Sequence, residues 1–189
     1  GFNLCMTGNN LDANLGNGVV IENTYGSVLA GNMIEECSGF AVILDRDCYG
    51  ITIGSNVIAH NGGGIDLRDA HGCSVSANTF TIMKNHAVRV GAHSGRINIT
   101  GNNFSNSYIG DGEVKRNPDD LAAAGITLES TTNILLSGNL FSGLTSPAVQ
   151  LDTGDSRNVL FNNNLLIDVQ SEHAELRDSM TKNIMQTEK

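Results

Sequence analysis

Apolar and polar residues alternate along this chain in a pattern that returns about every 23 residues, and an asparagine marks each return. The seven asparagines in this position are Asn9, Asn32, Asn56, Asn78, Asn102, Asn139 and Asn164. The intervals between them are 23, 24, 22, 24, 37 and 25 residues. Five of the six intervals agree to within three residues, so the pattern indicates a repeated structural unit.

Each repeat contains short segments in which alternate residues are apolar, which is the period of a β-strand with one buried side. Around Asn102, for example, Ile97 and Ile99 precede the asparagine and Phe104 follows it. A further segment of this kind follows most of the asparagines, as in residues 64–67 (Gly-Ile-Asp-Leu). Three short strands in about 23 residues leave no room for the helices of a βαβ sheet. We therefore predict coils that stack at a strand spacing of roughly 4.8 Å and pair in parallel.

The recurrent asparagines are predicted to form a ladder inside a turn. Each side-chain amide would bond backbone groups and the amide of the next coil, where the polar groups of the turn would otherwise be buried without partners. We therefore interpret these seven residues as structural and not as a binding site.

The repeats resemble the right-handed β-helix superfamily of pectate lyases, polygalacturonases, mannuronan epimerases and phage tail spikes, from about Leu4 to Leu176. The resemblance implies an all-β fold, a right-handed single-stranded parallel β-helix (solenoid) of about seven coils of 22–25 residues. It implies less about activity, because the same repeat carries lyases, hydrolases, epimerases and inert scaffolds. It also identifies the Gly-apolar-x-apolar strands as the first sheet, on whose outer face such enzymes build their clefts.

Charged residues gather at the middle of the outward positions of this first sheet and in the turns that follow it. The candidate catalytic residues are Asp45, Asp66, Arg68, His71, Arg89 and His93. The candidates for substrate binding on the same face are Asp47, Asp69 and Glu129. A groove lined with carboxylates, guanidinium groups and imidazoles could hold an extended sugar chain, since the protein and the glycan both repeat linearly.

One interpretation of this groove is proton abstraction from an acidic sugar. Arg68 or Arg89 would neutralise a uronate carboxylate and thereby make the neighbouring α-proton more acidic. His71 or His93 would remove that proton, since the ordinary pKa of histidine lies near neutrality. The reaction would be β-elimination or epimerisation.

Two other interpretations stay open. Asp45 and Asp66 could be the paired carboxylates of a glycoside hydrolase, at roughly 5.5 Å for retention or 6.5–9.5 Å for inversion. Alternatively, the charges are ladders of cross-strand salt bridges, because Asp45 lies under Arg68 and Asp66 under Arg89. His86 falls in a predicted turn and is interpreted as a surface residue.

The segment 64–69 resembles the Asp-Pro-His-Asp motif of mannuronan epimerases and matches both of its aspartates, at Asp66 and Asp69. Leu67 replaces the proline, and Arg68 replaces the histidine that the family uses in catalysis. The resemblance therefore implies acid-sugar chemistry without a matching catalytic residue.

An insertion at 105–124 interrupts the repeat and leads into the first-sheet strand at Ile126. We expect it to overhang that sheet, where Lys115 and Arg116 could bind substrate, although it could also be a tolerated surface loop. No cofactor is firmly indicated. Calcium is the candidate, on the acidic oxygens of the insertion, although the spacing of an EF-hand is missing. These acidic residues are Asp111, Glu113, Asp119 and Asp120.

Composition excludes several classes of function. The formal net charge of −9 opposes a nucleic-acid backbone, and no stretch approaches the roughly 18 apolar residues of a membrane span. The four cysteines lack the spacing of a metal site. The β-helix is assigned to residues 1–176 and a cap or tail to residues 177–189, and we expect the natural solenoid to extend further toward its N-terminus.

The sequence thus predicts a carbohydrate-active β-helix. The leading expectation is a polysaccharide lyase, epimerase or glycoside hydrolase that is secreted, periplasmic or at the cell surface, with polysaccharide as its partner and neither nucleic acid nor membrane. The alternative is a non-catalytic module that binds glycans or is purely structural. Nothing in the sequence indicates an oligomeric state.

Overall fold

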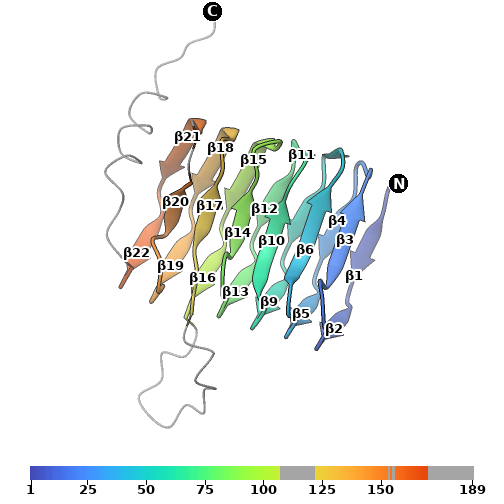
Figure 1. The fold of residues 1–189 in the computed structure, drawn as a ribbon, viewed down its shortest axis with the longest axis horizontal. Helices are drawn as coiled ribbons and strands as arrows, with labels where there is room; N and C mark the ends of the chain where they lie inside the picture. The colour runs from blue at the N-terminus through green and yellow to red at the C-terminus, as the bar shows by residue number, and fades with distance from the viewer. Residues whose placement is uncertain (107–121, 153, 155, 170–189) are drawn as a thin grey trace, which may run out of the picture.

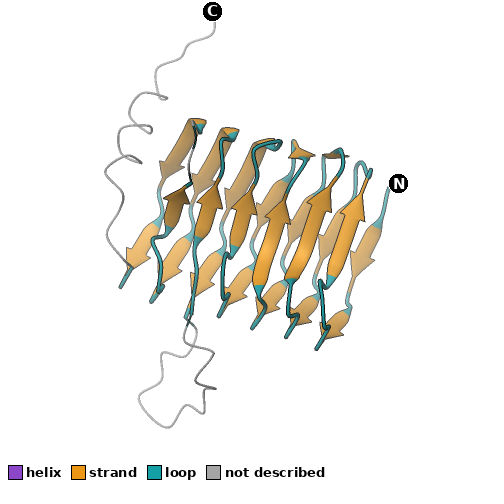
Figure 2. Ribbon diagram, in the orientation of Figure 1, coloured by secondary structure: helices purple, strands orange, loops and turns teal. Residues whose placement is uncertain are grey.

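The computed structural model describes residues 1–106, 122–152, 154 and 156–169, which form a parallel β-helix. In Figure 1 the coils lie side by side from the N-terminal coil to the coil of β22 (Leu165–Ile167). All of the strand pairs in the described ranges are parallel. Figure 2 shows strands and loops in these ranges and no helix. The predicted all-β solenoid is confirmed.

Three sheets run along the solenoid. The first sheet has six strands, which are β3 (Val19–Glu22), β6 (Phe40–Asp45), β10 (Gly63–Leu67), β14 (Val88–Val90), β17 (Ile126–Leu128) and β20 (Val149–Leu151). The second has nine, which are β1 (Cys5–Thr7), β4 (Val28–Ala30), β7 (Cys48–Tyr49), β8 (Thr52–Gly54), β11 (Ala70–His71), β12 (Ser74–Ser76), β15 (Gly95–Thr100), β18 (Thr132–Ser137) and β21 (Arg157–Asn162). The third consists of β2 (Asn10–Asp12), β5 (Met33–Glu35), β9 (Val57–Ala59), β13 (Thr79–Thr81), β16 (Asn103–Ser105), β19 (Leu140–Ser142) and β22. Six strands in the first sheet and seven in the third agree with the expected coil number of about seven.

The register of the first sheet stacks residues from equivalent places in successive repeats. Asp66 pairs with Ile43 on one side and with Arg89 on the other, and Arg89 pairs with Thr127 on the next coil. Because side chains alternate between the two faces of a strand, these four residues share the outward face. The sheet therefore presents the predicted column of outward positions.

Stacked apolar side chains fill the interior of the coil. Phe80, Phe104 and Phe141 lie one above another, with ring centroids 4.7 Å and 4.9 Å apart, and all three are fully buried. Aliphatic residues such as Ile53 and Ile99 occupy equivalent inward positions on the second sheet. This burial of the inward positions on every coil is the main driving force for stacking.

The asparagine side chains stack in the turn between the second and third sheets. Asn78, for example, donates from Nδ2 to the carbonyl oxygen of Ile53 and to Oδ1 of Asn102, both at 3.0 Å. The residue before each asparagine has a positive φ, which turns the chain sharply between the two strands. These residues are Gly8, Gly31, Ser55, Ala77, Gly101, Gly138 and Asn163. The left-handed turn points these amides inward, and those of the middle coils bond backbone carbonyl groups that water cannot reach.

Several sequence-based expectations fall outside the described residues. They are Lys115 and Arg116, the acidic candidates for calcium (Asp111, Glu113, Asp119 and Asp120), and the cap or tail at 177–189. The four cysteines lie within the described part and are free thiols, three of them buried. In the same part of the chain, no helix is long and apolar enough to cross a membrane.

Candidate functional site

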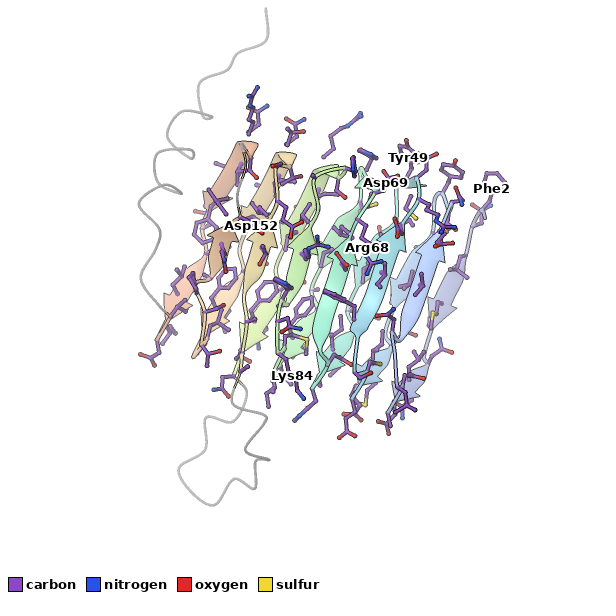
Figure 3. All side chains as sticks on the ribbon, viewed as in Figure 1. Phe2, Tyr49, Arg68, Asp69, Lys84 and Asp152 are labelled. Carbon is purple, nitrogen blue, oxygen red and sulfur yellow. The ribbon has the colours of Figure 1, made fainter. Side chains whose placement is uncertain are left out.

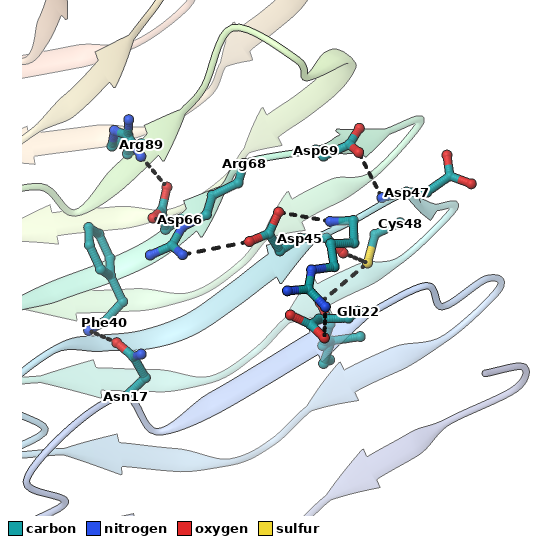
Figure 4. Close-up of polar contacts among 12 residues, drawn as sticks. Asn17, Glu22, Phe40, Asp45, Asp47, Cys48, Asp66, Arg68, Asp69 and Arg89 are labelled. Carbon is teal, nitrogen blue, oxygen red and sulfur yellow. Dashed lines mark hydrogen bonds and ion pairs between the residues drawn. The ribbon is translucent and has the colours of Figure 1, made fainter.

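A continuous row of ion pairs crosses the outward face of the first sheet from β6 to the end of β17. It consists of Asp45, Arg68, Asp66, Arg89 and Glu129, which we call the charged row. Figure 4 shows two of its contacts between neighbouring coils, from Asp45 to Arg68 and from Asp66 to Arg89. Parallel pairing places Asp45 beside Arg68 and Asp66 beside Arg89. Arg68 also reaches Asp66 on its own strand, and Arg89 reaches diagonally to Glu129 on the next coil.

Asp66 is the buried centre of the charged row. Its side chain is 1% exposed, and both of its oxygens are engaged. Oδ2 accepts a hydrogen bond from Nε of Arg68 at 2.7 Å, and Oδ1 accepts one from Nη1 of Arg89 at 3.0 Å. A buried carboxylate is tolerated only when it is paired in this way. Asp66 therefore orients the two arginines and is itself covered by them.

The two arginines also bind the outer carboxylates of the row. Arg89 donates from Nε and Nη2 to the two oxygens of Glu129, each at 2.6 Å. This bidentate pair is the main cause that raises the pKa of Arg89 above its ordinary value. Nη1 of Arg68 lies 3.6 Å from Oδ2 of Asp45, a longer contact on a more exposed side chain. The structure thus contains both cross-strand pairs of the salt-bridge interpretation.

His86 also lies on this face, although the sequence analysis predicted a surface residue in a turn. It precedes β14 and is half-buried, and its Nδ1 lies 2.8 Å from Oγ1 of Thr127. Burial lowers the pKa of His86 below its ordinary value of 6.5, and the positive charge of Arg89 lowers it further. The carboxylates of Glu129 and Asp66 act in the opposite direction but more weakly. Both effects favour the neutral form of the His86 imidazole beside the charged row.

Phe40 lies parallel to His86 on the same face. The two ring centroids are 6.3 Å apart, and the angle between the ring planes is 4°. They come from coils that are separated by the coil of Gly63, and a Cβ at Gly63 would lie 2.4 Å from Cε1 of Phe40. The missing side chain at Gly63 thus lets the Phe40 ring lean toward the imidazole.

A strict alternation of inward and outward residues along the strands does not predict that His86 and Phe40 lie on this face. Residues 87 and 88 are both buried, so the chain bends at the start of β14 and His86 faces outward three residues before Arg89. In the same way, Phe40 lies three residues before Ile43, and Gly63 lies three residues before Asp66. A histidine three residues before an outward arginine is the signal that could have revealed His86.

The other two candidate histidines lie outside the charged row. Nε2 of His71 is 3.4 Å from Oδ1 of Asp69, whose Oδ2 accepts a hydrogen bond from the backbone N–H of Asp47. The His71 ring, in the second sheet, stacks on Tyr49 at 5.4 Å and extends an aromatic column through Tyr25 to Phe2. Figure 3 places Tyr49 and Asp69 at the edge of the coil, away from Arg68.

His93 is exposed in the turn after β14 and takes no part in the ion pairs described above. Within the described ranges, no group of three or more histidine, cysteine or acidic side chains could hold a metal ion. The groups that this face offers for chemistry are therefore the imidazole of His86, the ring of Phe40 and the charged row.

Comparison with known proteins identifies the family. A family model described as a right-handed β-helix region matches residues 1–104. The chain belongs to the right-handed β-helix family. This membership agrees with the handedness and the superfamily expected from the repeats, whereas no curated protein sequence matches the chain.

Solved structures of two β-helix proteins are similar to this family member. The periplasmic alginate epimerase AlgG superposes with a TM-score of 0.62 at 19% identity, over 87% of this chain and 40% of that one. DFA-IIIase from Arthrobacter chlorophenolicus A6, in complex with DFA-III, gives a TM-score of 0.52 at 17% identity, over 92% of this chain and 48% of that one. This chain therefore spans less than half of either structure. At this level of identity the likeness establishes the fold.

Proposed function

We propose that this β-helix processes a polysaccharide that lies along the outward face of the first sheet, and that His86 is its proton-transfer residue. The linear face offers an aromatic ring, an imidazole, carboxylates and guanidinium groups along successive coils. Two structural neighbours are named as carbohydrate-related proteins, an alginate epimerase and a DFA-IIIase bound to DFA-III, which supports the same class of ligand. A location in the periplasm or outside the cell is part of this proposal, and it is supported by a structural neighbour that is named as periplasmic.

The observation that carries this proposal is the environment of His86. A general base works best when it is neutral, fixed in position and reachable, and His86 combines a lowered pKa, a contact with Thr127 and a half-buried ring. If Nδ1–H donates to Oγ1 of Thr127, Nε2 carries the lone pair that accepts a proton. That proton comes from a sugar C–H in elimination or epimerisation, or from water in hydrolysis.

A second candidate function is a non-catalytic glycan-binding module. The observation that favours it is the internal pairing of the charged row, in which Asp66 has both oxygens engaged by arginines and Arg89 is bound on three nitrogens. Such pairs can be purely structural ladders. In that case the face would bind a glycan without changing it.

Incubation of the protein with a panel of uronic-acid and neutral polysaccharides, with and without calcium, tests the proposal. We expect one polymer to be converted, and the product identifies the reaction. Unsaturated sugars indicate a lyase, new reducing ends alone indicate a hydrolase, and an altered epimer ratio indicates an epimerase. Retention of a polymer without any product would support the binding module instead.

The pH dependence should follow the lowered pKa of His86. The base must be neutral to act, so activity should persist below pH 6.5 and decline only as the pH falls through the pKa of His86 in the folded protein. An NMR titration of the His86 ring should have its midpoint below 6.5 and should coincide with the acid limb of kcat/KM. A midpoint at or above that value would contradict the electrostatic environment described above.

A further inference from the structure

We infer that the first-sheet face selects uncharged glycans over polyuronates, and that Glu129 is the residue that sets this preference. The class of ligand meant here is a neutral sugar chain, or a uronate chain whose carboxylates are esterified. The inference rests on the proposed function, because it assigns a substrate class to the same surface. It differs from the acid-sugar chemistry that Arg68 and Arg89 suggest in the sequence.

The guanidinium groups of this face are already neutralised by the protein. Arg89 contacts both oxygens of Glu129 and one oxygen of Asp66. Arg68 contacts the other oxygen of Asp66 and lies within ion-pair distance of Asp45. A uronate carboxylate could reach either arginine only by displacing one of these carboxylates or by sharing the guanidinium group with it.

The balance of charge on the face is negative. The charged row contains three carboxylates and two guanidinium groups. Asp152 lies beside Glu129 on the next coil, because Leu128 pairs with Leu151, and it acts electrostatically on His86, so it adds to the negative field. With a net charge of −9 for the whole chain, the field repels a polyanion before it reaches the surface. Hydroxyl groups of an uncharged glycan meet no such repulsion.

Glu129 is the member of the row on which this selectivity depends. Its backbone N–H donates to the carbonyl oxygen of Val90 at 2.9 Å, which fixes it beside β14. Its side chain is 23% exposed and that of Arg89 is 29% exposed, so the pair lies at the surface that a ligand would touch. Asp66, in contrast, is buried beneath the arginines, and its replacement would leave them unpaired and destabilise the fold.

The test compares wild type with Glu129→Gln, a substitution that keeps the shape and removes the charge. The probes are polygalacturonate and alginate, each as the acid form and as its ester, together with a neutral glucan and a neutral fructan. We expect wild type to bind uncharged members of the panel in preference to the acid forms. In Glu129→Gln, affinity for the acid form should rise by about tenfold, the order of magnitude of one charge-assisted contact that Arg89 is then able to make.

Glu22→Gln is the matched control. Glu22 lies beside Asp45 of the charged row, on the preceding coil, and also pairs with an arginine, but that partner, Arg46, is largely exposed. The Glu22→Gln substitution changes the net charge by the same amount as Glu129→Gln, so a general charge effect would appear equally in both variants. We expect Glu22→Gln to leave the preference for the uncharged form in place.

Three outcomes would overturn the inference. If wild type binds an acid form more tightly than its ester, the face does not select uncharged glycans. If both glutamine variants gain equally, Glu129 is not the determinant, although glycan binding and the proposed function stand. If no polymer of the panel binds to wild type, the proposed function fails together with the inference.

Discussion

Replacement of His86 by asparagine is expected to lower kcat/KM on the converted polysaccharide by about 100-fold to 10,000-fold, the range that general acid–base catalysis contributes. The amide can keep a hydrogen bond to Thr127, which the imidazole now contacts through Nδ1. It cannot accept a proton at physiological pH, so the chemical step loses its base. The measurement is steady-state turnover with the polymer that the substrate panel identifies.

Two further variants separate proton transfer from position and folding. Thr127→Val removes only the hydroxyl that holds the His86 ring, so we expect a smaller loss than in His86→Asn. His60→Asn replaces a histidine in the turn after β9, on a different sheet, and should leave turnover unchanged. If His86→Asn retained activity within a few-fold of wild type, the proton would have to move through another group, such as Asp45 or Glu129.

Replacement of Asn78 by alanine is expected to lower the free energy of unfolding by about 3–5 kcal/mol, because it leaves buried partners without hydrogen bonds. The Asn78 side chain donates to Ile53 and Asn102, and its Oδ1 accepts from both the backbone and the side chain of Asn56. Asn78 is 1% exposed, so water cannot take over these contacts. Urea denaturation followed by circular dichroism measures the change.

Asn9→Ala supplies the matched control at the exposed end of the same ladder. Asn9 donates to Thr7 and to Asn32, but it is exposed, so water can replace its bonds. We expect a loss below about 1 kcal/mol, the net value of an ordinary hydrogen bond. Equal losses in Asn9→Ala and Asn78→Ala would show that burial of the amide does not determine the strength of the ladder.

The repeat predicts most of the fold because each coil has the same local pattern of residues. An apolar residue on alternate positions marks an inward side chain, and the asparagine marks a fixed place in the turn. Once that place is known, the register follows, and Asp66 must lie beside Arg89. The outward positions could therefore be assigned from sequence spacing alone.

The candidate site was only partly predictable. The carboxylates and arginines of the charged row follow from the register, but their pairing does not, because a side chain can reach either neighbouring coil. Arg89 contacts Asp66 on one side and Glu129, 40 residues away, on the other. This double pairing changes the arginines from free cations into neutralised groups.

His86 and His71 show most clearly what the spacing of residues in the sequence does not predict. Strict alternation missed the bend at residues 87 and 88, which turns His86 toward Arg89 and Thr127. His71 was expected beside the charged residues because it follows a first-sheet strand, whereas its ring stacks on Tyr49 in the second sheet. Small changes of backbone direction at a corner decide which sheet a side chain belongs to.

The sequence by itself determined the stacked coil, the parallel register and the structural place of the asparagines, because these depend on a local pattern repeated many times. Only the tertiary structure decided which charges neutralise each other, which histidine faces them and how deeply Asp66 is buried. Those properties depend on distances of a few ångströms between side chains on different coils, and the spacing of residues along the chain does not specify such distances.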